Sequence, residues 1–135
     1  MKVLLDTNVL IAALIARGVC ADLLEHCVLN HTLVTSEALL GELREKLLSK
    51  FKFSERDTNE AVGLIRSQMT IVDPTPLESP VCRDPDDDIV LATAILGSAA
   101  CVVTGDKDLL ILKSIEAIPI VSPREFSEFE TREEE

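Results

Sequence analysis

The stretch KVLLDTN at residues 2–8 decides how the rest of the chain is interpreted. Its apolar run, residues 3–5, predicts a buried parallel strand, because strands covered on both faces are nearly continuous in aliphatic residues. Asp6 follows at the point where that strand ends, and ligands of open α/β sheets bind outside the carboxyl ends of the strands. Asp6 or Asn8 could instead cap a helix by a local hydrogen bond. Capping alone does not explain a carboxylate at the strand tip.

A second stretch of this kind is VVTGDKD at residues 102–108. Asp106 and Asp108 follow an apolar strand and a glycine, so a plain tight turn is the alternative interpretation. If both segments are parallel strands of one sheet, Asp6 and Asp106 lie at the same edge.

Acidic residues are densest between these two stretches, at residues 84–88. Acids in the first turn of a helix are favoured by the helix dipole, so a capping role is possible here too. Four carboxylates in five residues exceed what a cap needs, and a bound cation would offset their repulsion. Oxygen ligands alone favour Mg²⁺ or Mn²⁺. The four acids are Asp84, Asp86, Asp87 and Asp88.

Strands and helices alternate along the chain, with no internal repeat. Their alternation predicts a three-layer α/β/α sandwich with a five-stranded parallel sheet in a domain of residues 1–125. Residues 126–135 are expected to be an acidic, frayed tail. The predicted strands are 2–6, 32–35, 69–72, 101–104 and 118–121, and the predicted helices are 9–16, 21–29, 36–47, 54–68 and 86–99.

Composition narrows the classes of function. A chain of 135 residues forms one domain, and its formal net charge of −11 argues against a basic nucleic-acid platform. The four cysteines have no C-x-x-C spacing, and His26 and His31 are not placed to complete a zinc set with them. We therefore expect reduced, buried thiols in a cytoplasmic protein. No apolar run approaches the roughly 20 residues of a membrane span.

Taken together, four acidic segments resemble those of the PIN domain, a metal-dependent ribonuclease fold found in many prokaryotic toxin–antitoxin toxins. The resemblance covers residues 1 to about 123. The matching residues are Asp6-Thr7-Asn8, Ser36 to Glu42, Asp87 with Leu91, Ala92 and Ala94, and Val103-Thr104-Gly105-Asp106-Lys107-Asp108.

This resemblance implies a sheet order of 3-2-1-4-5 and assigns roles to individual residues. Periodicity does not distinguish Glu42 from its neighbours, so its place in the site rests on the resemblance alone. Asp88 is the reserve for Asp87, and Asp108 is an optional further ligand. The implied catalytic set is Asp6, Glu42, Asp87 and Asp106, with the metal on Asp6, Asp87 and Asp106 and with Thr7, Asn8 or Thr104 orienting them.

The resemblance also implies a function. We expect Mg²⁺- or Mn²⁺-dependent hydrolysis of RNA, a small antitoxin partner and a homodimer. A haloacid-dehalogenase-like phosphatase is the rival enzyme, but it needs a second Asp where this chain has Asn8. A signalling receiver domain would need paired acids at the first strand tip and a lysine after the fifth strand. A non-catalytic metal-binding interaction module is the third alternative.

Overall fold

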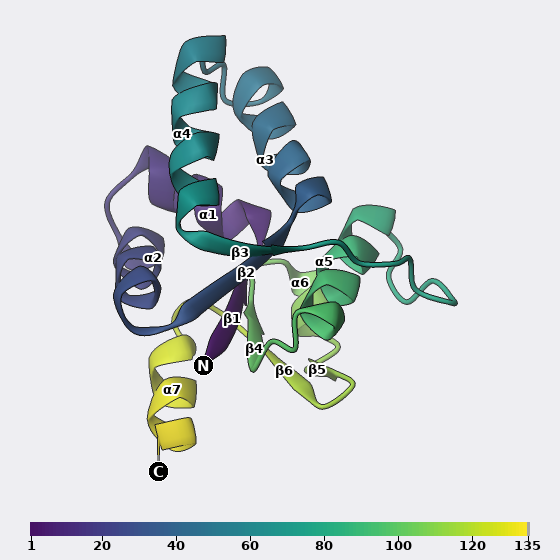
Figure 1. Cartoon of the computed structure of the whole chain (residues 1–135). Coiled ribbons are helices and arrows are strands. Elements are labelled where there is room, and N and C mark those ends of the chain that lie inside the picture. The colour runs from purple at the N-terminus through teal and green to yellow at the C-terminus, as the bar shows by residue number, and fades with distance from the viewer. Residues whose placement is uncertain (135) are drawn as a thin grey trace.

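The computed structural model describes residues 1–134, which form a mostly parallel sheet between helices (Figure 1). The strand order is β3-β2-β1-β4-β6-β5. The five strands from β3 to β6 are parallel and have the predicted order, with β6 as the fifth. The strands are β1 (Lys2–Leu5), β2 (Thr32–Ser36), β3 (Met69–Val72), β4 (Cys101–Val103), β5 (Ser114–Ile115) and β6 (Ile118–Val121).

The sheet has six strands, so the predicted number of five is wrong. The extra strand, β5, pairs antiparallel with β6 at the edge of the sheet. A two-residue turn, Glu116-Ala117, joins them, and both residues have positive φ, 45° and 67°. Positive φ at both central residues is the requirement of a type I′ turn, which favours Asn and Gly. Neither Asn nor Gly occupies the two turn positions, so the usual sequence signal of a β-hairpin is missing.

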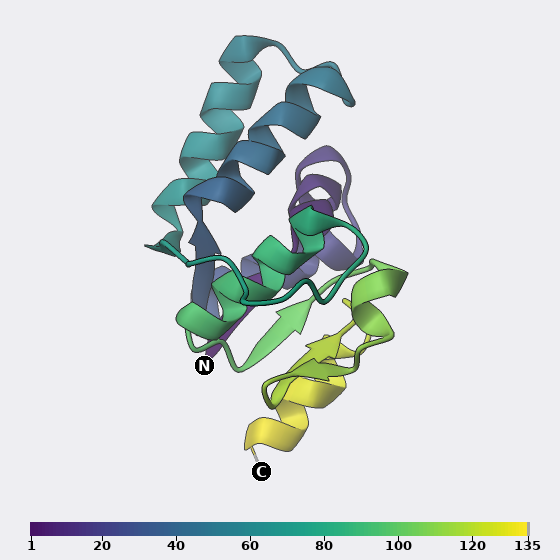
Figure 2. The same cartoon turned by 90° about the vertical axis from the view of Figure 1, so that its right-hand side faces the viewer.

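Helices cover both faces of the sheet, as the two orthogonal views show (Figures 1 and 2). α3 and α4 form a hairpin that extends from one end of the molecule. No single helix within residues 1–134 is long and apolar enough to cross a membrane, and α1 with α2 qualifies only as a pair bent by 107°. The helices are α1 (Thr7–Ile15), α2 (Val19–Asn30), α3 (Glu37–Ser49), α4 (Glu55–Ser67), α5 (Pro85–Leu96), α6 (Lys107–Leu110) and α7 (Phe126–Glu134).

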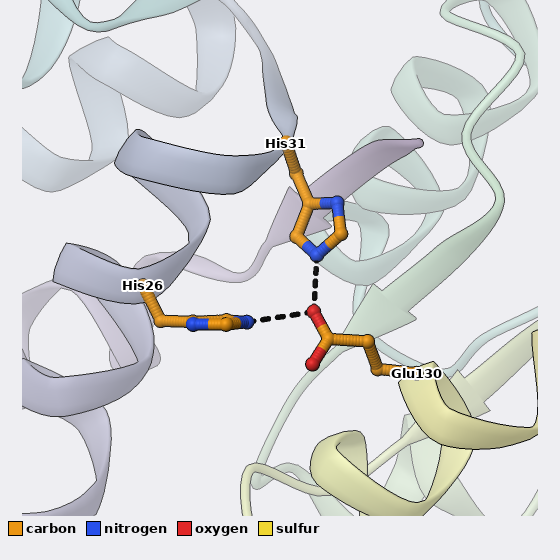
Figure 3. Close-up of side chains that lie close together, drawn as sticks. All are labelled: His26, His31 and Glu130. Atoms are coloured by element: carbon orange, nitrogen blue, oxygen red, sulfur yellow. Dashed lines mark hydrogen bonds and ion pairs between the residues drawn. The ribbon is translucent and has the colours of Figure 1, made fainter. Parts of the chain in front are cut away.

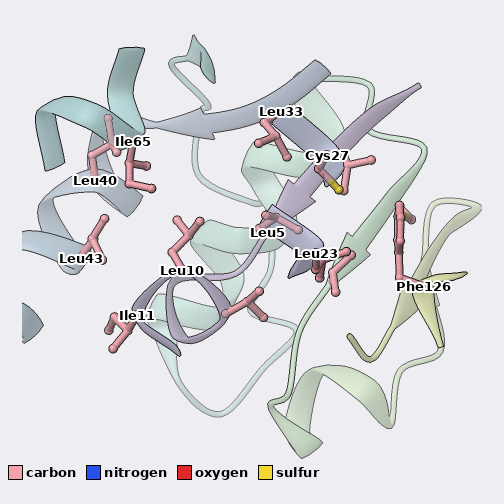
Figure 4. Packing of buried hydrophobic residues seen from close by; sticks show 14 of the residues in the cluster. Leu5, Leu10, Ile11, Leu23, Cys27, Leu33, Leu40, Leu43, Ile65 and Phe126 are labelled. Atoms are coloured by element: carbon pink, nitrogen blue, oxygen red, sulfur yellow. The ribbon is translucent and has the colours of Figure 1, made fainter. Parts of the chain in front are cut away.

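Alternation along the central strands divides the core into two layers, because successive strand residues point to opposite faces. Val3 and Leu5 of β1 pack with α1, α2, α3 and α7, whereas Leu4 packs with α5 and α6. Figure 4 shows the first of these layers around Leu5, Leu10 and Leu23. The side chains of Val3, Leu4 and Leu5 are all buried, which fixes the strand whose tip carries Asp6.

The C-terminal segment is a helix and not a frayed tail over residues 126–134. α7 anchors itself through Phe126 and Phe129, one helical turn apart and both buried in the first core layer. A capping box precedes it, in which Glu125 N–H donates to Ser122 Oγ and Ser122 N–H donates to the Glu125 carboxylate. Most of the acidic residues of this segment therefore lie on the solvent side of a docked helix.

Candidate metal centre

The acidic residues meet where the strand order of the sheet reverses. β1 and β4 are neighbours, and their connections lead to opposite sides of the sheet. Such a switch point is where open α/β sheets bind ligands. Asp6 follows β1 directly, and Asp106 lies just beyond β4 as the N-cap of α6. The parallel pairing of Leu5 with Val103 brings these two chain segments into register.

Thr104 joins the two aspartates. Its hydroxyl donates to Asp6 Oδ2 at 2.7 Å and accepts the backbone N–H of Asp106 at 3.0 Å. Thr104 is fully buried, so its hydrogen bonds hold the Asp6 carboxylate and the Asp106 backbone in place. Asp6 also caps α1 by accepting the Thr7 N–H at 2.7 Å. The capping role and the strand-tip role of Asp6 therefore coexist.

Asp87 reaches the same place from α5. Oxygen atoms of Asp87, Asp106 and Asp108 lie within 4.8 Å of one another. Burial, and then the negative charge of Asp106, raise the pKa of Asp87 to about 7. The fold makes ionisation of this carboxyl group unfavourable. A bound divalent cation would offset that cost, since the cation favours the ionised form. The all-oxygen donor set fits Mg²⁺ or Mn²⁺.

The pKa of Asp6 is also raised. Burial raises its pKa above the ordinary value, while the hydrogen bond from Thr104 acts in the opposite direction. Its exposed fraction is only 5%. Two of the clustered carboxyl groups are therefore biased towards the protonated form when no cation is bound, a frequent property of functional sites.

Glu42 faces this cluster from α3, together with a lysine that the sequence analysis did not single out. Lys46 Nζ lies 2.8 Å from Glu42 Oε1 and 3.4 Å from Asn8 Oδ1. Burial raises the pKa of Glu42, the ion pair with Lys46 opposes this, and the charge of Asp6 adds to the rise. Lys46 thus places one positive charge beside the acids. Its i, i+4 spacing from Glu42 was the available signal.

The remaining predicted residues take different positions. Asp88 turns away from the cluster and accepts N–H groups of Val81 and Cys82, at 2.9 Å for Cys82. Asp108 lies in the cluster and pairs with Arg83 at 2.9 Å. Asn8 meets Lys46, and the buried Thr7 hydroxyl has no hydrogen-bond partner within residues 1–134. Thr104 is therefore the residue whose side chain orients Asp6.

Comparison with known proteins places this geometry in a family. The PIN domain family model matches residues 2–108, which include every acid of the cluster. The chain belongs to the PIN domain family. A relative, "Uncharacterized protein MJ1680" of Methanocaldococcus jannaschii, is 33% identical over 145 residues, which span 95% of this chain and 90% of the relative.

Solved structures share the fold at low sequence identity. VapBC2 from Rickettsia felis, bound to a DNA fragment from their promoter, superposes with a TM-score of 0.66 at 19% identity, covering 90% of this chain and 98% of that one. VapBC-1 from nontypeable Haemophilus influenzae gives 0.65 at 16%, covering 92% and 99%. VapC20 of Mycobacterium tuberculosis, a sarcin–ricin loop cleaving toxin, gives 0.59 at 16%, covering 87% and 99%.

Proposed function

We propose that this protein is a Mg²⁺- or Mn²⁺-dependent endoribonuclease and the toxin of a toxin–antitoxin pair. The observation that carries the proposal is the grouping of Asp87, Asp106 and Asp108 within 4.8 Å of one another at the switch point between β1 and β4, with Asp6 linked to Asp106 through the Thr104 hydroxyl. The rise in the pKa of Asp87 to about 7 supports it, since a structural acid gains nothing from such a position.

The residues of the cluster have separable roles in phosphodiester hydrolysis. Asp6, Asp87 and Asp106 would hold the ion, with Asp108 as a further oxygen ligand. When bound, Mg²⁺ or Mn²⁺ would stabilise charge on a phosphate oxygen and supply a water of lowered pKa. Glu42 would orient the attacking water or hold a second ion, and its carboxylate is kept in position by Lys46. Thr104 fixes the orientation of Asp6.

Family membership and the related structures support RNA as the substrate. VapC20 is described as a toxin that cleaves the sarcin–ricin loop, an RNA element, and it shares this fold. The net charge of −11 does not oppose the proposal, because bound divalent cations would neutralise part of the acidic cluster where phosphate approaches.

We further propose a small antitoxin partner, a homodimer and a cytoplasmic location. The VapBC structures that share the fold motivate the antitoxin. Exposed apolar side chains on α1, α2 and α4 motivate a symmetric interface, namely Ile15, Leu29 and Leu64. The four cysteines are free thiols, as expected of a reducing compartment.

The rival functions are less well supported by the site. A haloacid-dehalogenase-like phosphatase would use a nucleophilic Asp followed two positions later by an acid, and Asn8 instead contacts Lys46. A non-catalytic module would not require three carboxylates to converge beside a buried hydroxyl. Metal binding without RNA cleavage would favour the non-catalytic module over the ribonuclease.

The direct test is RNA cleavage by the purified chain. We expect single-stranded or structured RNA to be cut with Mg²⁺ or Mn²⁺ and to remain intact with a chelator. Asp6→Asn and Asp106→Asn should each abolish turnover while the protein stays folded, because the loss of a charge relieves repulsion in the metal-free site. Asp57→Asn, an exposed change in α4, is the matched control.

Cleavage that persists in the chelator would overturn the metal mechanism. Near-full activity of Asp106→Asn would remove that residue from the catalytic set. Light scattering at micromolar concentration tests the dimer, and co-purification with the product of the adjacent reading frame tests the antitoxin.

A further inference from the structure

A second cluster of metal-ligand side chains lies away from the acids, between α2 and α7. His26 comes from α2, His31 follows the end of that helix, and Glu130 comes from α7. Both rings direct Nε2 towards the same carboxylate oxygen, Oε2 of Glu130 (Figure 3). The distance from His26 is 2.7 Å. One ligand atom from each residue thus lies within 4.8 Å of the others.

We propose that His26, His31 and Glu130 form a Zn²⁺ site that fastens α7 to the body of the domain. Two imidazole nitrogens and one carboxylate oxygen are a donor set that suits zinc, and three protein ligands leave a fourth position for water or another ligand. The acidic cluster at the other site offers only oxygen atoms, so the two sites differ in the ions they prefer.

The surroundings match a three-ligand site with one open side. The side chains of His31 and Glu130 are 7% and 16% exposed, whereas that of His26 is 44% exposed. A surface groove adjoins His26 and Glu130, and Asp22 lines it one helical turn before His26. Water, or the carboxylate of Asp22, can therefore approach from the His26 side, while the other ligands are fixed by packing.

Only small side-chain movements separate the present arrangement from zinc coordination. With bonds of about 2.0–2.2 Å, tetrahedral zinc holds its ligand atoms about 3.3 Å apart. The His26–Glu130 distance of 2.7 Å is shorter by roughly 0.6 Å, so His26 and Glu130 would move apart by less than 1 Å. The cation would then replace the two Nε2 protons that now point at Glu130.

Zinc on Nε2 requires a proton on Nδ1 of each ring, and the neighbours of Nδ1 therefore matter. The Asn30 amide nitrogen lies 3.3 Å from Nδ1 of His26 and donates to the His26 carbonyl oxygen at 2.9 Å, so this amide would move when Nδ1 carries the proton. The Met1 amine nitrogen lies 3.3 Å from Nδ1 of His31 and would also move when that nitrogen carries the proton.

The position of the proposed zinc site determines which helix it would stabilise. α7 is held by Phe126 and Phe129 in the core, and most of its other side chains are exposed, including the acidic Glu128, Glu133 and Glu134. Glu130 is the residue through which it touches α2 in a polar contact. A ligand that binds only the folded state raises stability by mass action, so zinc should protect α7 most.

The test uses the full chain with Zn²⁺ alone, and Co²⁺ as a spectroscopic probe, at pH 8 after chelator treatment. We expect one tight zinc equivalent, a higher Tm, and visible Co²⁺ absorption typical of a nitrogen-containing four-coordinate site. His26→Gln and Glu130→Gln should each weaken zinc binding by at least about tenfold. Glu128→Gln, an exposed change on the same helix, is the control.

A second set of variants distinguishes zinc binding at this site from zinc binding at the acidic cluster. Asp6→Asn/Asp106→Asn should keep the tight zinc equivalent and the Co²⁺ spectrum, and His26→Gln should keep RNA cleavage with Mn²⁺. Zinc affinity that is unchanged in His26→Gln and Glu130→Gln would overturn the proposal, as would zinc binding lost only in the aspartate variants. The three side chains would then form a hydrogen-bonded clamp only.

Discussion

The Thr104 hydroxyl and Asp6 Oδ2 lie 2.7 Å apart, although 98 positions separate the two residues in the sequence. The contact joins the ends of β1 and β4, and the same hydroxyl accepts the Asp106 N–H. One buried oxygen atom therefore holds both the Asp6 carboxylate and the Asp106 backbone. A site that binds a cation needs its ligands held in advance of binding, because otherwise ordering them reduces the affinity.

Removal of this hydroxyl should impair both folding and activity. Thr104→Val keeps the shape but leaves Asp6 Oδ2 without its donor and the Asp106 N–H without its acceptor. We expect a loss of about 1–3 kcal/mol in the free energy of unfolding and RNA cleavage slowed by about 10–100-fold. Thr104→Ser retains the hydroxyl and is the control. Urea unfolding and initial rates with one RNA would measure both, and equal behaviour of Val and Ser would refute the role.

The pKa of Asp87 predicts how the metal-free protein responds to pH. An Asp has a pKa of about 3.9 when unfolded, and that of Asp87 is about 7 in the fold. Because the folded value is raised, the contribution to stability is complete below about pH 4 and is lost as pH rises through 7. Asp87→Asn should come closest to the parent below about pH 4 and exceed its Tm by the largest margin at pH 8. Thermal melts in chelator measure this.

Metal should reverse this pH dependence. Mn²⁺ favours ionised Asp87, so the gain in Tm on adding Mn²⁺ should be larger at pH 8 than at pH 5. Asp57→Asn provides the control because Asp57 is exposed on α4. A Mn²⁺-induced rise in Tm that is absent at neutral pH would mean that these carboxylates serve as helix caps and solvated surface.

We expect the positive charge of Lys46 to offset part of the repulsion among the acids of the site. Its ammonium is 2.8 Å from Glu42 Oε1, and its positive charge also lowers the pKa of Asp6, whose burial raises it. Lys46→Met should therefore lower the Tm of the metal-free protein at pH 8 and enlarge the rise produced by Mn²⁺. Lys50→Met, one helical turn further on an exposed position, should leave both values unchanged. Equal Mn²⁺ responses in the two variants would contradict this role.

The β5–β6 turn offers a stabilising substitution. Glu116 and Ala117 both have positive φ, which costs non-glycine residues about 1–2 kcal/mol each. Glu116→Asn with Ala117→Gly supplies the residues that a type I′ turn favours, and we expect a gain of about 1 kcal/mol in the free energy of unfolding. Ala61→Gly inside α4 should lose about 1 kcal/mol. Denaturant titrations would show both, and a loss in the turn variant would contradict the assignment.

The central strands could be predicted from the sequence because burial on both faces imposes continuous apolar runs such as residues 3–5. The meeting of Asp6 and Asp106 followed, since parallel strands end at one edge. Both features follow from the local order of apolar and acidic residues in the sequence. The prediction that Asp87 rather than Asp88 faces the cluster rested on the family resemblance, and Asp88 instead accepts backbone N–H groups near Cys82.

Features that depend on distant packing were missed. Glu130 meets His26 and His31 only because Phe126 and Phe129 dock α7 onto the core, and spacing in the sequence does not show that contact. Strand β5 was missed for a different reason. Its turn uses Glu116 and Ala117 in a conformation that their residue types disfavour, so the local sequence opposed the tertiary result.

The short strand β5 also determines how the sheet meets other chains. Unpaired edge strands are templates for strand addition and aggregation, and very short edges reduce that risk. With β5 only two residues long, that side offers little backbone for a partner. The opposite edge, β3, is four residues long, carries the exposed side chain of Ile71 and ends before Pro74. Any association through sheet extension would therefore be confined to β3.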